Sequence, residues 1–517
     1  MSSRKTYYVT TPIYYVNDVP HIGHAYTTLA CDVLARFMRL DGRDVHFLTG
    51  TDEHGQKIEK AAAAAGLAPQ AFADKVSVSF RELIGAMNYS PDNFIRTTEP
   101  RHYRACQALW EKLEEAGDIY LGKYAGWYSV RDETYFVEGE TEVGPDSKRR
   151  ALSTGAEVEW VEEPSYFFRL SAWAERLLAF YEANPRFIAP ESRRNEVLSF
   201  VRGGLQDLSV SRTSFSWGVP VPGDPKHVMY VWLDALTNYI TECGYPDTSD
   251  ALWKFWPADL HMVGKDIIRF HCVFWPAFLM AAGVAPPQRV FAHGWWTNEG
   301  QKISKSLGNV IDPVELVATY GLDPVRYFLL REVPFGNDGD FQRRAMIGRL
   351  NGDLANAYGN LCQRVLSIVA RNCGGQVPGK GPLIDADTAL LERARALLAI
   401  VRTELEEQAF HRALAALWDV VGEANRYVDA QAPWALAKTD PARRDTVLWV
   451  LAETIRRVTL LVQPFMPGSA ARILDQLAVP EAQRAFSAFD AELLPGTALP
   501  APQGVFPRYA EPAKAAS

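Results

Sequence analysis

Two histidines near the start of the chain form the first of two motifs that could do chemistry. His21 and His24 flank Ile22 and Gly23 at the entry to an amphipathic segment. Imidazole nitrogens at a helix amino terminus add donors where the backbone amides already favour negative charge, which suits a triphosphate. Gly23 would let a nucleotide approach the backbone closely. The ordinary interpretation of an isolated pair is helix capping and packing, so the motif needs support from elsewhere.

A lysine-rich segment far downstream supplies that support. Lys302 and Lys305 alternate with Ser304 and Ser306 in a loop that follows Gly300. Two mobile cations and two hydroxyls could close over a departing pyrophosphate, although most Lys-x-x-Lys segments are simply solvated. When a carboxylate attacks the α-phosphorus of ATP, the charge on the phosphates must be stabilised electrostatically. The two motifs together therefore predict an adenylate-forming site that uses ATP.

The segments around the histidine motif predict how it is positioned. Residues 6 to 16 are rich in β-branched and aromatic side chains and predict a buried strand, whereas residues 22 to 40 carry apolar side chains with helical spacing. A second strand is expected at 44 to 49. In open α/β sheets, ligands bind beyond the carboxyl ends of the strands of such βαβ units. The motif at 21 to 24 falls at that place.

The rest of the chain divides into segments of different composition. The expected order is a first α/β half at 1–117, a β-rich connective insertion at 118–225, a second α/β half with the lysine-rich loop at 226–345, an all-α bundle at 346–480 and a tail at 481–517. Heptad-like apolar spacing in 385–425 and 445–465 indicates the bundle. The sequence therefore predicts a split Rossmann-like α/β domain followed by a helical domain.

Composition restricts the classes of protein that remain. The 517 residues are 48% hydrophobic, with no uninterrupted apolar run of the roughly 20 residues that a membrane helix needs, so we expect a cytoplasmic protein without a membrane partner. Six scattered cysteines without a Cys-x-x-Cys pair argue against a disulfide framework. Because the formal net charge is -8, any RNA surface must be a local patch.

The two motifs together resemble the His-x-Gly-His and Lys-x-Ser-Lys-Ser elements of class I aminoacyl-tRNA synthetases, with Ile303 in place of the commoner Met. Four further segments are similar to methionyl-tRNA synthetases in particular: 10–17, 50–55, 230–235 and 264–271. The similarity spans nearly the whole chain. The resemblance implies that the substrates are L-methionine, ATP and tRNA(Met). It also implies that the helical domain binds the anticodon.

The resemblance also assigns residues to each part of the reaction. His21, His24, Lys302 and Lys305 would be catalytic. ATP would be bound by Gly23, Gly264, Asp266, His293, Lys302, Ser304 and Lys305. Methionine would lie among Ile13, Tyr15, Asp52, Trp232, Ala235, Tyr239, His271 and Trp275, with Asp52 facing the ammonium group. The anticodon would be read by Asn360, Arg364 and Trp434.

Each assignment has an ordinary alternative. An Asp after a strand more often forms a turn or a cap than binds an ammonium group. Trp232 and Trp275 would most often be plain core residues, and Trp434, which follows a proline after a helix, would most often plug a core. The physical setting of each side chain separates these interpretations.

The family context gives further expectations about metals and assembly. Magnesium should accompany ATP. In many relatives, cysteines at the positions of Ser129 and Asp132 form half of a zinc knuckle, and their replacement here predicts that no structural zinc is bound. Because the sequence stops soon after the bundle, the extra dimerising domain of some relatives is not expected, and we expect a monomer.

Three other functions fit the sequence less well. A synthetase for leucine, isoleucine or valine would usually carry a large editing insertion, and one for cysteine would use zinc-binding cysteines. A non-catalytic tRNA-binding paralogue should have lost His or Lys from one motif, and both motifs are intact. A small nucleotidyltransferase with the histidine motif would be shorter and would lack the helical domain.

Metal analysis tests the prediction about zinc. We expect the purified chain, washed with a chelator, to hold far less than one zinc per molecule, because Ser129 and Asp132 replace soft thiolate ligands. The measurement is elemental analysis by mass spectrometry. Stoichiometric zinc in the washed protein would contradict the prediction.

Overall fold

A parallel β-sheet lies at the centre of the catalytic half of the chain. The computed structural model describes residues 5–16, 19–132, 134–303 and 307–511. The strand order is β10 (Ile188–Ala189), β16 (Val290–His293), β15 (Leu260–Gly264), β1 (Thr6–Thr10), β3 (Asp44–Asp52) and β2 (Tyr14–Tyr15), with β4 (Asn93–Arg96) also paired to β3. Every pair in this sheet is parallel. All the carboxyl ends therefore meet at one edge.

The first βαβ unit follows the prediction closely. Helix α1 spans Ile22–Leu40, and its Gly42 adopts a positive φ of 80° just beyond the end of the helix. The strand expected at 44 to 49 continues to Asp52. The single strand expected at 6 to 16 is divided into β1 and β2, because Pro12 has no amide N–H to offer a ladder. The first half is completed by α2 (Gln56–Ala64), α3 (Pro69–Ala86) and α4 (Pro100–Glu115).

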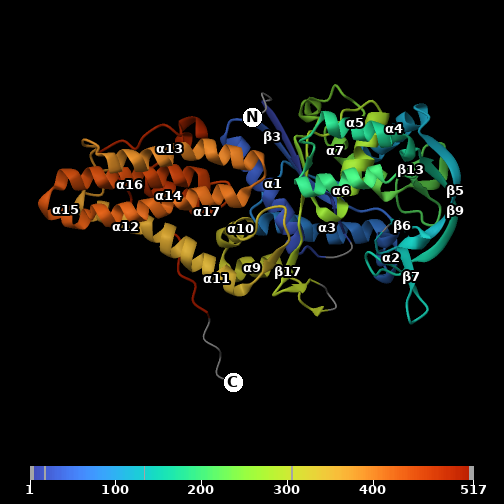
Figure 1. Ribbon diagram of the computed structural model, residues 1–517, viewed down its shortest axis with the longest axis horizontal. Helices are drawn as coiled ribbons and strands as arrows, with labels where there is room; N and C mark the ends of the chain where they lie inside the picture. The colour runs from blue at the N-terminus through green and yellow to red at the C-terminus, as the bar shows by residue number, and fades with distance from the viewer. Residues whose placement is uncertain (1–4, 17–18, 133, 304–306, 512–517) are drawn as a thin grey trace, which may run out of the picture.

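The insertion expected at 118–225 contains many strands and also two helices. A β-rich part contains β5 (Ile119–Ser129), β6 (Thr134–Phe136), β7 (Thr141–Val143), β8 (Arg149–Ala151) and β9 (Glu159–Phe168), and Figure 1 shows it at one end of the molecule. Residues 174–202 instead form α5 (Ala174–Ala183) and α6 (Glu191–Arg202), and β10 between them joins the central sheet. Four short strands follow: β11 (Leu208–Ser209), β12 (Ser211–Arg212), β13 (Pro220–Val221) and β14 (Asp224–Met229).

The second α/β half returns to the central sheet. Its helices are α7 (Val231–Thr241), α8 (Trp275–Ala281), α9 (Pro313–Tyr320) and α10 (Leu322–Arg331). A small sheet is formed by β17 (Trp296–Asn298), β18 (Gln301–Lys302) and β19 (Gly339–Phe341). Lys302 lies on β18, and the predicted Ser304 and Lys305 lie outside the described residues.

The predicted all-α bundle is present beside the sheet domain (Figure 1). Its helices are α11 (Arg343–Arg349), a π-helical stretch (Leu350–Gly359), α12 (Asn360–Asn372), α13 (Asp385–Glu406), α14 (Phe410–Gln431), α15 (Pro433–Thr439), α16 (Pro441–Val462) and α17 (Pro467–Gln476). Helix α16 is buried along most of its length and forms the axis of the bundle. The tail docks on the bundle, with Val505 buried and the amide of Tyr509 donating to Asn351 at 2.8 Å. The predicted fold class is confirmed.

A fully buried ion pair joins the two halves. Arg326 on α10 and Asp32 on α1 are both 0% exposed, with 2.7 Å between guanidinium and carboxylate. The same guanidinium donates to the carbonyls of Pro464 and Phe465 at 2.9 Å each, and to that of Met87 at 3.0 Å. One side chain of α10 therefore fixes the helix of the histidine motif and the turn between α16 and α17.

Candidate active site

A cavity of about 460 Å³ opens at the carboxyl edge of the central sheet. Its wall includes Pro12, Asp52, Gly264 and His293, which end or follow four different strands. Of the residues assigned to methionine and ATP, the cavity brings together Ile13, Tyr15, Asp52, Trp232, Ala235, Tyr239, His271, His21, Gly23, His24, Gly264, Asp266 and His293. Residues more than 250 positions apart therefore meet in one pocket.

The two histidines of the motif cap helix α1 and also face the cavity. The amide of Gly23 donates to Nδ1 of His21 at 3.0 Å, and the amide of His21 donates to Nδ1 of His24 at 3.1 Å, which forms a capping box. Because each Nδ1 accepts a hydrogen bond, a neutral ring must carry its proton on Nε2. Capping and function are therefore compatible, since the cap itself leaves one N–H donor on each ring.

His21 is exposed and His24 is half-buried, and desolvation by the surrounding protein favours the neutral form of both rings. Desolvation lowers the pKa of His21, against the opposing charge of Asp266, and lowers the pKa of His24 well below its usual value. The charge of one ring also disfavours a charge on the other, because their centroids are 4.0 Å apart. The motif thus offers neutral donors and no fixed positive charge.

Two glycines of the cavity wall stand where a Cβ would collide with a neighbouring side chain. A Cβ on Gly23 would lie 2.8 Å from the ring of His21, so the capping geometry requires glycine there. A Cβ on Gly264 would lie 2.5 Å from Oδ1 of Asp266. The same carboxylate accepts a hydrogen bond from Nε1 of Trp295 at 3.2 Å. Gly264 and Asp266 therefore form one close-fitting corner together with Trp295.

His293, at the end of β16, forms a hydrogen bond with helix α1. Its Nδ1 lies 2.8 Å from the carbonyl of Gly294, and its Nε2 lies 2.7 Å from the hydroxyl of Thr27. Burial lowers the pKa of His293, which favours the neutral ring. Because a carbonyl only accepts, the neutral ring donates from Nδ1 to Gly294 and accepts from Thr27.

The floor of the cavity is aromatic. The hydroxyl of Tyr239 lies 2.7 Å from Nε2 of His271, whose Nδ1 lies 3.0 Å from the carbonyl of Ile267. Burial lowers the pKa of His271 to about 4, so the neutral ring donates from Nδ1 and accepts from Tyr239. Tyr239 also stacks on His261 with centroids 4.0 Å apart. The hydroxyl of Tyr239 and both ring nitrogens of His271 are therefore used in hydrogen bonds within the protein, and the floor is an aromatic cage.

The two tryptophans assigned to this floor differ in position. Trp232 lines the cavity and stacks on Phe270 with ring centroids 3.6 Å apart. Trp275 is 0% exposed and does not line the cavity, but it lies behind Tyr239 with centroids 6.1 Å apart. The ordinary interpretation as a core residue therefore fits Trp275, which supports the cage from behind.

Buried charges hold the first turn of helix α7, which carries Trp232, Ala235 and Tyr239. Asp234 accepts from His54 at 2.6 Å and from His102 at 2.7 Å, and both rings are almost fully buried. Burial alone would raise the pKa of Asp234, but the two histidines outweigh it and lower the pKa. His54 follows Asp52 in the chain, so this contact fixes the end of β3 against α7.

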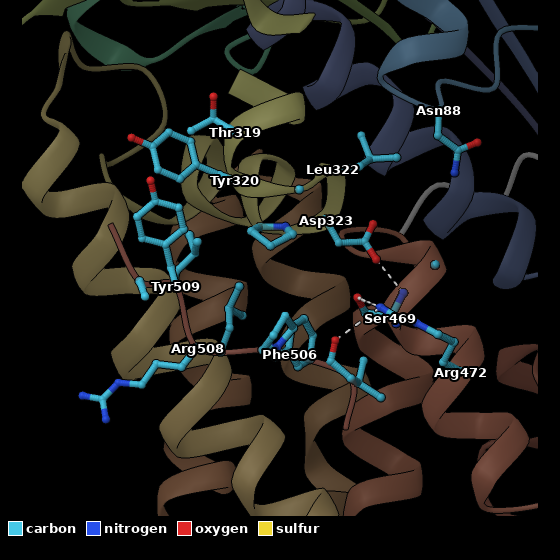
Figure 2. A pocket seen from close by; sticks show the side chains of 18 residues that line it. Asn88, Thr319, Tyr320, Leu322, Asp323, Ser469, Arg472, Phe506, Arg508 and Tyr509 are labelled. Atoms are coloured by element: carbon cyan, nitrogen blue, oxygen red, sulfur yellow. Dashed lines mark hydrogen bonds between the residues drawn. The ribbon is translucent and has the colours of Figure 1, made fainter. Parts of the chain in front are cut away.

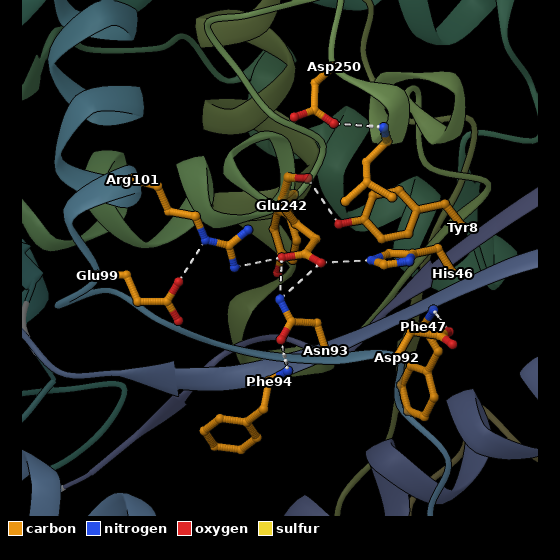
Figure 3. A network of polar contacts seen from close by, with 12 residues as sticks. Tyr8, His46, Phe47, Asp92, Asn93, Phe94, Glu99, Arg101, Glu242 and Asp250 are labelled. Carbon is orange, nitrogen blue, oxygen red and sulfur yellow. Dashed lines mark hydrogen bonds and ion pairs between the residues drawn. The ribbon is translucent and has the colours of Figure 1, made fainter.

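A second network holds the other end of α7, as Figure 3 shows. The carboxylate of Glu242 lies 2.8 Å from Nε2 of His46. It also accepts hydrogen bonds from the side chains of Asn93 and Arg101, each at 2.9 Å. Burial opposes ionisation, but these partners lower the pKa of Glu242. Strands β3 and β4 and helix α4 therefore all grip the helix that forms one wall of the cavity.

The residues assigned to the anticodon share one exposed surface of the bundle. Asn360 and Arg364 lie one turn apart on α12, and the guanidinium of Arg364 lies 5.6 Å from the ring centroid of Trp434 on α15. Trp434 is 49% exposed, which rules out the alternative of a core plug. Ala432 has a left-handed φ of 43° between α14 and α15, and this bend turns Trp434 toward α12.

The segment that replaces the zinc knuckle is filled by hydrogen bonds. The hydroxyl of Ser129 accepts from the amide of Asp132 at 3.1 Å, and the carboxylate of Asp132 pairs with Arg131 at 3.0 Å. Among the described residues, the only cluster with metal-ligand spacing is His102, Cys106 and Asp234. Burial raises the pKa of Cys106 well above its usual value, so its sulfur is a thiol and a poor ligand. The absence of zinc stays a prediction.

Sequence reasoning missed several residues of the cavity, of which Trp295 and Thr27 make polar contacts with predicted site residues. Trp295 lines the cavity beside Asp266, and Thr27 binds His293. Trp295 directly follows His293 and Gly294, so its place after a strand end was the signal that could have revealed it. Thr27 carried no such signal, because a threonine one turn into a helix is common.

Comparisons with known proteins agree over the whole chain. The sequence model of a family described as tRNA synthetases class I (M) matches residues 7–366, and that of the anticodon binding domain of methionyl tRNA ligase matches residues 377–516. A methionine–tRNA ligase of Mesorhizobium japonicum is 61% identical over 98% of this chain and 99% of its own length. One from Brucella suis is 58% identical, again over 98% of this chain and 99% of its own length.

Solved structures are equally similar. A Mycobacterium tuberculosis methionyl-tRNA synthetase in complex with methionyl-adenylate has a TM-score of 0.96 and 57% identity, and the alignment covers 97% of this chain and 100% of that one. The free state of the M. tuberculosis enzyme has a TM-score of 0.90 and 53% identity, with 99% and 100% covered.

The capping geometry predicts the protonation of the two histidines. We expect His21 and His24 to be neutral at pH 7 and protonated at Nε2, since burial lowers both pKa values and so moves protonation to lower pH. Long-range ¹H–¹⁵N correlation spectra of histidine-labelled protein report both properties, with His21→Gln and His24→Gln used for assignment. A charged ring at pH 7, or a proton on Nδ1 of either ring, would contradict this prediction.

Proposed function

The chain belongs to the methionyl-tRNA synthetase family of class I tRNA synthetases, and we propose that the family's reaction takes place in the cavity at the carboxyl edge of its sheet. Methionine and ATP form methionyl-adenylate and pyrophosphate, and the methionyl group then passes to tRNA(Met). The observation that carries this proposal is one pocket with an aromatic floor and neutral histidine donors at its mouth.

We infer that methionine occupies the aromatic floor. A thioether is polarisable and packs well against ring edges, and the polar atoms of Tyr239 and His271 are engaged with each other, so the floor suits an uncharged side chain. Asp52 is 2% exposed at the end of β3 and would hold the ammonium group. Ile13, Tyr15 and Ala235 would close the sides.

ATP would lie across the mouth of the same cavity. His21 and His24 would donate from Nε2 to phosphate oxygens, and Asp266 beside Gly264 would accept from the ribose hydroxyls. His293 stands at the end of β16 in the same wall. Lys302 on β18 would contact the leaving pyrophosphate together with Ser304 and Lys305, which lie outside the described residues.

The chemistry then needs no covalent intermediate on the protein. The methionine carboxylate attacks the α-phosphorus, a new C–O–P linkage forms, and the bond to pyrophosphate breaks. Neutral histidine donors fit this step because they can follow charge as it moves to the leaving group, while the lysines supply the full positive charge. Positioning and electrostatic stabilisation would account for most of the rate.

Magnesium would enter with ATP. It prefers oxygen ligands, and the two carboxylates of the cavity wall, Asp52 and Asp266, already have the roles given above. Phosphate oxygens and water would therefore supply most of its ligands, and the ion would screen charge between the phosphates.

A monomeric state and a cytoplasmic location stay predictions. No helix among the described residues is long and apolar enough to cross a bilayer.

We also propose that the surface formed by Asn360, Arg364 and Trp434 binds the anticodon. Unpaired bases stack on aromatic rings and guanidinium planes, and both are exposed side by side here. Asp429 pairs with Arg364 at 2.7 Å, so this carboxylate would orient the guanidinium. The overall negative charge of the chain makes such a local patch necessary.

Exchange of labelled pyrophosphate into ATP tests the substrate. We expect exchange that depends on L-methionine and is close to background with leucine, isoleucine, valine and cysteine, because an aromatic floor without an ionisable partner selects a long uncharged side chain. The assay is run with each amino acid in turn. No exchange with methionine would refute the proposal.

Trp434→Ala separates the anticodon surface from the catalytic cavity. We expect kcat/KM for tRNA charging to fall by about ten- to a hundredfold, since stacking on one base contributes about 1–3 kcal/mol. Pyrophosphate exchange should be unchanged. Trp160→Ala, which removes a similarly exposed tryptophan from the insertion, is the matched control for exposed surface. Equal loss of exchange and charging in Trp434→Ala would contradict the assignment.

A further inference from the structure

A second cavity, larger than the first, lies at the junction of the two domains. Its volume is about 760 Å³, within the range of small-molecule sites. Figure 2 shows side chains of α9 and α10, of α17 and of the tail around it. The walls come from residues 319–324, 468–472 and 505–510, with Leu350 and Leu354 from the π-helical stretch. No step of the reaction above uses this cavity.

The carboxylate of Asp323 is the polar anchor of this cavity. The residue is 7% exposed, and its Oδ2 accepts from the amide of Ser469 in the first turn of α17. Its Oδ1 is buried and has no hydrogen-bond partner among the described residues. Figure 2 shows this second oxygen directed into the space between Leu322 and Asn88. A buried carboxylate oxygen without a partner is costly and indicates that a donor is missing.

No nearby arginine supplies that donor. Arg326, one turn away on α10, gives its donors to Asp32 and to backbone carbonyls. Arg472 donates to the hydroxyl of Ser469 at 3.4 Å and to the carbonyl of Val505 at 3.3 Å. The guanidinium of Arg508 points away from Asp323 in Figure 2. Oδ1 of Asp323 therefore receives no hydrogen bond from these arginines.

Apart from Asp323, the two arginines and a few neutral polar residues, the walls are apolar and aromatic. The rings of Tyr320 and Tyr509 lie 5.2 Å apart, and Phe506 packs against Tyr358 with centroids 5.8 Å apart. Leu322 and Leu354 complete the lining near Asp323. Such walls favour a hydrocarbon or aromatic body, and ring faces attract a nearby cation.

We propose that this interdomain cavity binds a small organic cation, in which one protonated amine or guanidine on an apolar body donates to Asp323. A bare divalent ion would find one carboxylate where it needs several oxygen ligands. Because the walls belong to both domains and the tail, an occupied cavity stabilises their docked arrangement.

Phenethylamine is a suitable probe, and 2-phenylethanol is its neutral counterpart. Calorimetric titration of the full chain at pH 7, in saturating L-methionine so that any ammonium site at Asp52 is filled, should give saturable one-site binding of the amine. We expect the alcohol to bind at least about tenfold more weakly, because it lacks the charge-assisted hydrogen bond. Equal binding of the two, or no saturable binding of the amine, would overturn the proposal.

Variants locate the binding. Asp323→Asn keeps an acceptor for Ser469 but removes the charge, and should weaken phenethylamine about tenfold or more. Leu322→Trp fills the cavity and should abolish binding without altering the carboxylate. Asp312→Asn, at the cap of α9 where the aspartate accepts from Val314 at 2.8 Å, is the matched control and should bind normally. Unchanged binding in both cavity variants, or displacement of the amine by methionine, would refute the site; neither result bears on methionine activation, which pyrophosphate exchange measures separately.

Discussion

The buried ion pair of Arg326 and Asp32 holds α1 against α10, and the same guanidinium ties both helices to the turn between α16 and α17. Breaking a fully buried pair costs about 3–5 kcal/mol, because the remaining charge is left without a partner. The pair also fixes direction, since Arg326 donates to carbonyls beyond the carboxyl end of α16 while Asp323, one turn earlier, accepts at the amino end of α17. Cation and anion thus each meet the helix end that favours them.

Helix α1 connects this ion pair to the cavity at the carboxyl edge of the sheet. Asp32 is held by Arg326, and the same helix begins with His21 and His24. Helix α7 on the opposite side of the cavity is held at its first turn by His54 and His102 and at its last by His46 and Arg101. Both helical walls are therefore anchored by buried charges outside the cavity, which leaves the floor apolar.

The cavity is lined by four histidines and, among the described residues, by only two carboxylates, those of Asp52 and Asp266. Burial lowers the pKa values of His21, His24, His271 and His293, and in each ring a backbone partner fixes which nitrogen carries the proton. The Nε2 donors of His21 and His24 are held by the helix cap, and such neutral donors need no rearrangement when charge moves. Lys302, the described lysine of the second motif, is exposed on β18.

The sequence by itself determined the elements whose cause is local. Apolar spacing gave α1 its bounds, and the strand ends placed Asp52, Gly264 and His293 along one edge, because parallel strands must share it. Tertiary structure alone decided what depends on distant partners. The strand β10 pairs with β16 inside a segment that looked like a separate β-rich insertion, Trp275 stands behind the cage where Trp232 lines it, and Trp434 is exposed where its local pattern favoured burial. Periodicity reports which face is apolar, but only long-range packing decides what that face meets.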